Sequence, residues 1–363
     1  MTTGAPGQLE ALSELLRRLK LAERAVELHP LKPDTNKSAT AEKVAGYGQP
    51  VRVVAEDEQG QRKSFVLHTA SPNEFGHDRR ADRADELLLS YDTYGAIPGH
   101  VRAVDVGFLL DGRFASVAGA GEPYVLTTWA EGRPYAEDLR RIAADGLAEL
   151  DLRRCTALAN YLATLHAEKR AEPQIYRRSI RDLLGSGEGI FGIVDGYPAG
   201  TPAAPAQRLH QIERQCLDWR WRLREREHRL ARTHGDFHPF NILFGDGVEF
   251  SLVDASRGCA GDPADDVAAL AINWIFFAID QPTAWGSLGP LWHLFWQTYV
   301  GASQDEELFE VVAPFLAWRG LVVANPKFYP GLSEAGRDRL LGLVERVLAA
   351  RSLQLSWADD CFR

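Results

Sequence analysis

The stretch that decides the fold reads His234-Gly-Asp-Phe-His-Pro-Phe-Asn241, and Phe250-Ser-Leu-Val-Asp254 follows shortly after it. The second segment is apolar, has the pattern of a strand, and ends at a carboxylate. Phosphoryl transfer depends mainly on positioning a hydroxyl group and neutralising charge through metal ions. Asp236, Asn241 and Asp254 together supply the side chains for both tasks. Taken alone, the same residues would also fit a turn capped by Asp236.

The composition is that of a globular protein with more than one core. The chain has 363 residues, 45% of them hydrophobic and 25% charged, so two lobes are expected. No apolar run is long enough to span a bilayer and the N-terminus lacks the features of a signal peptide, which predicts a cytoplasmic protein without a membrane partner. The four scattered cysteines indicate neither disulfides nor zinc.

The net charge of −9 argues against a nucleic-acid partner, because phosphate backbones require clustered Lys and Arg. Such an acidic balance would suit a cationic substrate, although it is also common among ordinary cytosolic enzymes. The oligomeric state cannot be predicted from these features.

Hydrophobic periodicity predicts a small sheet domain followed by a helical one. The expected elements are a helix over 8–28, a hairpin of 50–56 and 63–69 with a turn at 58–61, a helix over 74–90, and strands over 101–110 and 122–128. From Arg133 the pattern becomes helical, and the Gly- and Pro-rich stretch 185–207 reads as a surface connection.

His-x-Asp-x-x-x-x-Asn followed by a strand ending in Asp resembles the catalytic signature of the protein-kinase-like fold. With Gly261-Asp-Pro-Ala-Asp-Asp266, the segment resembles the aminoglycoside phosphotransferase and choline kinase family. Residues 124–135 resemble that family's interlobe hinge and 158–166 its following helix, so the resemblance covers roughly residues 35–280.

The resemblance implies an α+β, two-lobed fold, with a small antiparallel-sheet N-lobe and a larger, mainly helical C-lobe. The expected divisions are an N-terminal helix over 1–30, a nucleotide-binding lobe over 31–128, and a catalytic and substrate-binding lobe over 129–363.

Residue roles follow from the same resemblance. Asp236 looks like the aspartate that accepts or orients the substrate hydroxyl, and His238 lies where it could contact the γ-phosphoryl group. Asn241 and Asp254 look like ligands of Mg²⁺, which needs few protein ligands when it bridges to nucleotide phosphates. His234 is expected to pack beneath the loop.

The substrate side is predicted less directly. Asp262 is expected to brace the catalytic loop through backbone amides, while Asp265 or Asp266 opens a helix and acts through its N-terminal dipole or faces the substrate. The C-terminal part is rich in aromatic residues, most of them expected in a helix core. Trp274 and Arg319 are candidates for substrate contact, with capping and anchoring of a buried helix as the alternative for Arg319.

The nucleotide side departs from the family pattern, because His68 stands where Lys or Arg usually anchors the α- and β-phosphates. An imidazole lacks a permanent charge, so His68 is a weaker anchor, Lys63 or Lys43 replaces it, or nucleotide binding is lost. Glu86 has the spacing of the anchor's carboxylate partner, with Asp82 and Asp85 as competitors. The remaining nucleotide-binding candidates are loop and hinge residues: Gly46, Gly48, Thr127 and Thr128.

These features predict a kinase that uses Mg²⁺ and ATP or GTP to phosphorylate a small-molecule hydroxyl. By resemblance, the acceptor is an aminoglycoside, an amino-sugar or another antibiotic-like compound; choline, a sugar or a nucleoside is the alternative. A catalytically inactive kinase-like binding module and a nucleotidyl transferase also stay open.

Overall fold

The computed structural model describes residues 6–31, 50–255 and 257–363. The chain forms two compact units, Met1–Leu126 (unit 1) and Thr127–Arg363 (unit 2). Among the described residues, no helix is long and apolar enough to cross a membrane.

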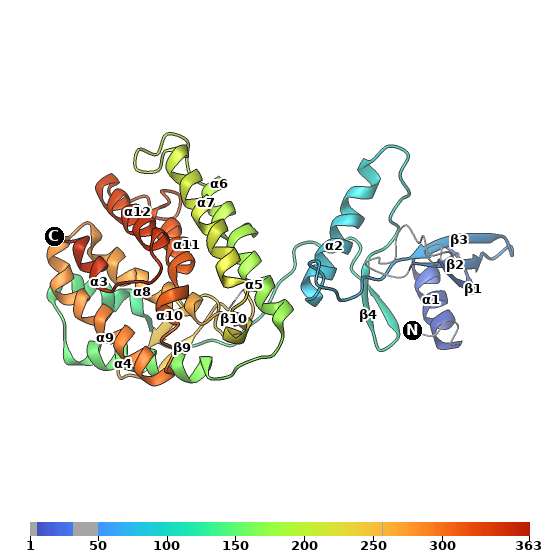
Figure 1. Ribbon diagram of the computed structural model, residues 1–363. Helices are drawn as coiled ribbons and strands as arrows, with labels where there is room; N and C mark the ends of the chain where they lie inside the picture. Colours follow the sequence, from blue (N-terminus) through green and yellow to red (C-terminus); the bar gives the residue numbers. More distant parts are fainter. Residues whose placement is uncertain (1–5, 32–49, 256) are drawn as a thin grey trace. The chain divides into compact units, whose positions relative to one another are not determined.

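Unit 1 is built on a three-stranded antiparallel sheet of order β1-β2-β3 (Figure 1). Its elements are α1 (Pro6–Arg18), β1 (Arg24–Pro30), β2 (Val51–Glu56), β3 (Arg62–Leu67), α2 (Arg80–Thr93), a 3₁₀ turn (Tyr94–Ala96), β4 (Gly107–Leu110) and β5 (Arg113–Ser116). The β2–β3 hairpin is confirmed: Asp57 N donates to Gln61 O at 3.0 Å, and Gly60 adopts a left-handed φ of 75°. Strands β4 and β5 form a separate ribbon.

The expected helix over 8–28 is wrong in its second half. Helix α1 ends at Arg18, Lys20 turns the chain with a φ of 57°, and β1 follows as a strand paired with β2. The helical spacing of the leucines extends past Arg18 in the sequence because Leu21, which lies beyond the end of the helix, packs on the same small core as the leucines of α1. The backbone N–H of Ala25 then donates to Ser13 Oγ at 2.9 Å, which ties the strand to the helix.

Other predicted elements of unit 1 are shifted or missing. Helix α2 begins at Arg80 instead of 74, where Asp82 accepts from the Arg79 N–H at 2.8 Å and marks the helix start. The expected strand over 101–110 is limited to β4, and residues 122–128 form an exposed loop. Their apolar side chains contribute nothing to the core of unit 1.

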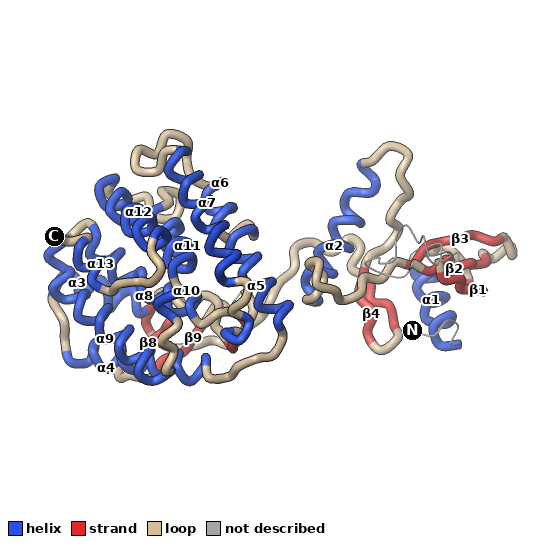
Figure 2. Tube along the Cα trace, in the orientation of Figure 1, coloured by secondary structure: helices blue, strands red, loops and turns tan. Residues whose placement is uncertain are grey.

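Unit 2 is mainly helical, as expected (Figure 2). Its helices are α3 (Tyr135–Asp145), α4 (Glu149–His166), α5 (Pro173–Gly185), α6 (Ile190–Asp195), α7 (Ala206–Leu223), α8 (Ala264–Ile279), α9 (Trp285–Ser303), α10 (Leu308–Val311), α11 (Ala313–Ala324), α12 (Glu334–Ala349) and α13 (Ser356–Asp360), with 3₁₀ turns at Glu227–Arg229 and Pro282–Ala284. Its strands are β6 (Arg133–Pro134), β7 (Ala231–Arg232), β8 (Ile242–Phe244), β9 (Phe250–Leu252) and β10 (Ala260–Gly261). They form the antiparallel sheets β6-β8-β9 and β10-β7. Because α6 lies inside 185–207, that stretch is not solely a connection.

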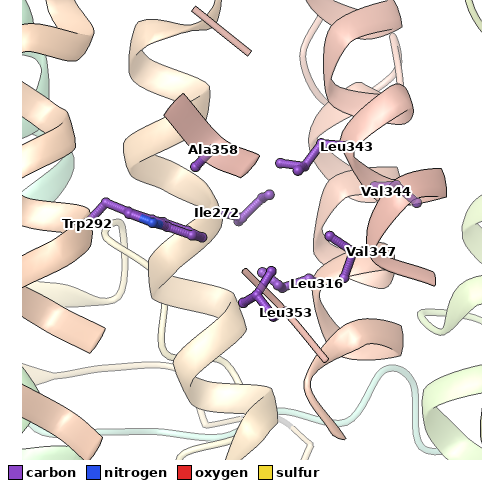
Figure 3. Close-up of a pocket in the computed structure, with 8 residues that line it drawn as sticks. All are labelled: Ile272, Trp292, Leu316, Leu343, Val344, Val347, Leu353 and Ala358. Carbon is purple, nitrogen blue, oxygen red and sulfur yellow. The ribbon is translucent and has the colours of Figure 1, made fainter. Parts of the chain in front are cut away.

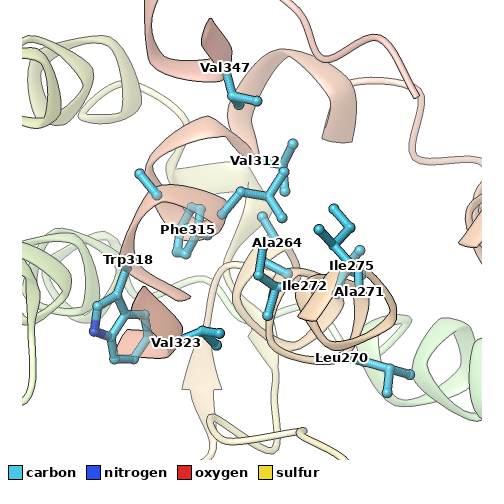
Figure 4. Packing of buried hydrophobic residues seen from close by; sticks show 14 of the residues in the cluster. Ala264, Leu270, Ala271, Ile272, Ile275, Val312, Phe315, Trp318, Val323 and Val347 are labelled. Carbon is cyan, nitrogen blue, oxygen red and sulfur yellow. The ribbon is translucent and has the colours of Figure 1, made fainter. Parts of the chain in front are cut away.

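The core of unit 2 is centred on α8, which is apolar on nearly all sides and packs against α9 and α11. Figure 4 shows Ile272 and Ile275 of α8 beside Phe315 and Val312 near the start of α11. Trp292, Trp296 and Phe295 of α9 are fully or almost fully buried, so the aromatic concentration is largely core, as expected.

A small cavity remains in this core between α8, α9, α11, α12 and α13 (Figure 3). Its volume is about 10 Å³, and its lining is wholly apolar, including Ile272, Leu316 and Val347. A space of this size without polar partners does not hold a water molecule stably. It is a packing defect, and the functional site lies elsewhere.

Candidate active site

The segment His234–Asn241 forms a tight loop between β7 and β8. Gly235 has a φ of 81°, and a Cβ at this position would lie 3.0 Å from Gly258 O, so glycine is needed here for both reasons. His234 is almost buried; its Nδ1 accepts from the Asp236 N–H at 3.3 Å, and its ring packs on Phe237. Burial lowers the pKa of His234, which favours the neutral ring as that acceptor.

Asp266, in the first turn of α8, fixes the backbone of this loop through hydrogen bonds. Its carboxylate accepts from the backbone N–H groups of His234 at 2.7 Å and Gly235 at 2.8 Å, and it lies 3.1 Å from His166 Nε2. His166 Nδ1 in turn lies 2.8 Å from the Tyr299 hydroxyl. Burial opposes ionisation of Asp266, but the His166 contact and the two amides outweigh it and lower its pKa.

Asp266 is fully buried and its carboxylate is already engaged, which does not favour the predicted contact with substrate. The bracing role expected of Asp262 is filled by Asp266 instead. Asp262 accepts from Arg229 Nε at 2.9 Å, from the Tyr176 hydroxyl at 2.9 Å and from the Ala264 N–H. Asp262 precedes α8 and Asp266 lies four positions later in its first turn, and sequence spacing alone does not decide which of them lies under the loop.

Asp236 is held by two arginines from distant parts of unit 2. Its Oδ1 accepts from Arg319 Nη1 at 2.7 Å and from Arg257 Nη2 at 2.5 Å. Arg319 also donates from Nη2 to Asp265 Oδ1 at 2.8 Å, which joins α11 to α8. Both guanidinium groups lie near the Trp318 ring, at 4.0 Å for Arg319 and 4.5 Å for Arg257.

The second carboxylate oxygen of Asp236 has weaker neighbours. His238 Nε2 and Asn241 Nδ2 each lie 3.5 Å from Oδ2. Partial burial works against the charge on Asp236, but His238, Arg319 and Arg257 outweigh it and hold its pKa far below the usual range. Asp236 is therefore a carboxylate at any physiological pH, with Oδ2 as the oxygen less committed to the protein.

Asn241 and Asp254 provide oxygen atoms suited to Mg²⁺. Asn241 is buried, and its Nδ2 donates to Asp236 O at 3.1 Å and lies 3.5 Å from Asp254 O, which leaves its amide oxygen as the possible ligand. Asp254 is exposed two residues after the end of β9, and its φ of 59° is a strained conformation that Asp tolerates better than most residues. Two hard oxygen ligands fit an ion that takes its remaining ligands from water and phosphate.

Two further substrate candidates have different outcomes. Trp274 is fully buried in the helical core, which does not favour the predicted contact with substrate. Arg319 is brought to Asp236, where its side chain is 8% exposed and bonded to two carboxylates. It can orient Asp236, and only a small part of it can reach a ligand.

The predicted nucleotide-binding residues belong to other parts of the chain. His68 is exposed just after β3, and Glu86 Oε2 lies 3.2 Å from His77 Nε2; no ion pair links Glu86 to His68 within the described parts of unit 1. Thr127 and Thr128 lie in an exposed loop. Gly46, Gly48 and Lys43 fall outside the described residues. The roles of all of these residues remain predictions.

Sequence reasoning missed two residues of this site. Arg257 follows Asp254 by three positions, but a lone arginine in a loop gives no signal of its target. His166 ends α4, and in the sequence it stands out only as the last residue of a helical pattern. Both reach the loop through tertiary contacts.

The model of the phosphotransferase enzyme family matches residues 44–293. No curated protein sequence matches the chain.

Solved structures with similarity include an ethanolamine kinase of Plasmodium vivax, with 14% identity over 88% of this chain and 79% of that one and a TM-score of 0.33. An aminoglycoside phosphotransferase of Streptomyces rimosus has 16% identity over 76% and 95%, with a TM-score of 0.31. A spectinomycin phosphotransferase solved with ADP and spectinomycin has 13% identity over 99% and 93%, with a TM-score of 0.30. At these values the similarity says nothing about the substrate.

Proposed function

Because the chain belongs to the phosphotransferase enzyme family, with a kinase-like fold and hydroxyl groups as acceptors, we propose that it is a small-molecule kinase using Mg²⁺ and ATP or GTP. The observation that supports this proposal is that Asn241 links the two segments that carry Asp236 and Asp254. Asn241 Nδ2 lies 3.1 Å from the main-chain oxygen of Asp236 and 3.5 Å from that of Asp254. One side chain thus ties the backbone at the proposed hydroxyl-binding residue to the backbone at the proposed metal ligand.

In the proposed reaction, Asp236 Oδ2 accepts a hydrogen bond from the acceptor hydroxyl and orients its oxygen toward the γ-phosphorus. The new oxygen–phosphorus bond forms as the bond from that phosphorus to the bridging oxygen breaks, and a nucleoside diphosphate leaves. The hydroxyl proton passes to Oδ2 late in this step, because the low pKa of Asp236 makes it a weak base. Bound Mg²⁺ would supply charge neutralisation at the phosphates, held by Asn241 and Asp254.

Aminoglycosides, amino-sugars and other antibiotic-like compounds are the first acceptors to test, on the strength of the family alone. Choline, sugars and nucleosides are the second group. A binding module without activity is a separate candidate, favoured by His68 at the anchor position, since an imidazole lacks the permanent charge of lysine.

The test follows label from γ-labelled ATP or GTP into a panel of hydroxylated small molecules, with Mg²⁺ present. The expected result is transfer that Asp236→Asn abolishes while nucleotide affinity changes little. The matched control is Asp246→Asn, in the β8–β9 turn. Nucleotide binding without turnover of any acceptor or of water would favour the binding module, and no nucleotide binding would refute the kinase. Label arriving from the α-phosphate would indicate nucleotidyl transfer instead.

A further inference from the structure

The three acidic residues around the start of α8, next to the catalytic loop, already have partners within the protein. Asp262 is bonded to Arg229, Asp265 to Arg319, and Asp266 to His166 and two backbone amides. A polycationic acceptor needs carboxylates that can bind its ammonium groups. If an ammonium group of the acceptor bound one of these carboxylates, the carboxylate would lose its wholly or largely buried partner in the protein. The partner left behind without its carboxylate would be strongly unfavourable.

Arg257, by contrast, presents part of its charge to solvent. Its Nε and Nη2 donate to Gly235 O at 2.8 and 2.5 Å, and Nη2 also binds Asp236, so the guanidinium is fixed in place. Its side chain is 24% exposed, and its Nη1 lies 3.6 Å from the Glu188 carboxylate, which is itself 70% exposed. A long, exposed ion pair of this kind contributes at most about 1 kcal/mol and is readily displaced.

Trp318 gives this arginine a fixed support. The Arg257 guanidinium lies 4.5 Å from the centre of the indole ring, and Trp318 Nε1 donates to the main-chain oxygen of Glu188 at 2.8 Å. The ring therefore cannot rotate away without losing a hydrogen bond. A planar cation held at two nitrogens, with a third facing solvent, is suited to binding one oxygen of a carboxylate or phosphate.

We infer that the acceptor carries an oxyanion, a carboxylate or phosphate group close to its reactive hydroxyl, and that Arg257 binds this group. The inference rests on the proposed function. Nη1 and Nη2 belong to one guanidinium, and Nη2 is in contact with the carboxylate that orients the hydroxyl. An oxyanion at Nη1 and a hydroxyl at Asp236 would therefore lie close together, at a separation that one small molecule such as a hydroxy acid or a sugar acid can span.

The test compares acceptors of similar size and different charge, namely glucuronate, glucose 6-phosphate, glucose and glucosamine, with γ-labelled ATP or GTP and Mg²⁺. Phosphorylation of an anionic member at a kcat/KM at least about tenfold above glucose and glucosamine is expected. The carboxylate and phosphate members show which oxyanion is preferred. Glucosamine as the best substrate would overturn the inference.

A binding measurement decides the matter if no member of the panel is phosphorylated. With Mg²⁺ and a non-hydrolysable ATP analogue present, sulfate is titrated by calorimetry into the wild type and into Arg257→Gln. Sulfate affinity at least about tenfold weaker in the variant is expected. The control is Arg346→Gln, since Arg346 also pairs with a carboxylate, Asp360 at 2.9 Å, and lies 4.7 Å from a Trp ring. Equal sulfate binding by wild type and Arg257→Gln would overturn the inference, whereas failure of the wild type to bind the nucleotide analogue would refute the proposed function itself.

Discussion

Replacing Asp266 by asparagine tests the brace beneath the catalytic loop. The carboxylate accepts from two backbone N–H groups at 2.7 and 2.8 Å and lies 3.1 Å from His166, in a fully buried position. An asparagine has only one side-chain oxygen, so its NH₂ group would replace the other carboxylate oxygen and would face either a backbone N–H group or His166, where a hydrogen bond would be lost. Hydrogen bonds to a charged group contribute about 1.5–3 kcal/mol each. If the asparagine forfeits one to two of these bonds, the variant should lose about 2–5 kcal/mol of unfolding free energy.

Urea unfolding at neutral pH, followed by tryptophan fluorescence, measures this loss. All nine tryptophans lie in unit 2, so the signal reports the unit that contains the brace. The matched control is Asp338→Asn, because Asp338 is 68% exposed and pairs with Arg208 at 2.7 Å. An exposed pair of this kind contributes about 0–1 kcal/mol.

The pH dependence of the unfolding free energy provides a second test of the Asp266→Asn variant. The pKa of Asp266 is lower in the folded protein than its ordinary value, so its stabilisation is complete above that value and is lost as the pH falls through the folded pKa. The difference between wild type and variant should be constant near neutrality and shrink in strong acid. A loss of unfolding free energy below about 1 kcal/mol at neutral pH, together with a raised KM for the acceptor, would show that Asp266 does not brace the loop. It would favour the predicted contact of Asp266 with the substrate instead.

Three further predictions address the metal, the nucleotide and the core. Asp254→Ala should weaken Mg²⁺–nucleotide binding in calorimetry by at least about tenfold, since even outer partners of metal ligands contribute 10–100-fold; unchanged affinity would remove Asp254 from the metal site. His68→Lys should tighten ATP binding if residue 68 is the phosphate anchor, and unchanged binding would indicate another cation, such as Lys63. Leu316→Ala enlarges an existing cavity and should lower the unfolding free energy by about 2–5 kcal/mol in urea titrations, with a loss below about 1 kcal/mol as the contrary result.

The catalytic segment could be predicted because its chemistry is local. Asp236, Asn241 and Asp254 are separated by one loop and one short hairpin, so their spacing in sequence limits their spacing in space. The kinase-like fold and the phosphotransferase family were predicted from this segment, and both are confirmed.

The partners of these residues could not be predicted in the same way. Arg319 lies 83 positions from Asp236, and its contact with that residue depends on how α11 packs against α8. Asp262 and Asp266 have the same side chain and neighbouring places in the sequence, and only the packing of α8 decides which one lies under the loop. Trp274 looked available because aromatic residues serve both cores and binding sites, and burial alone distinguishes the two.

The two units differ greatly in the size of their interiors. The buried apolar cluster described in unit 1 consists of Leu12, Leu16, Ala22, Ala25, Val53 and Ala55, half of them alanine. So little buried side-chain surface stabilises weakly, and regions with few apolar contacts open at the lower free energies. On heating, we therefore expect phosphotransfer to fail at a lower temperature than the tryptophan signal changes. Fluorescence melting curves would then overstate the thermal range in which the enzyme works, and residual activity after a heat pulse would be the sounder measure of its durability.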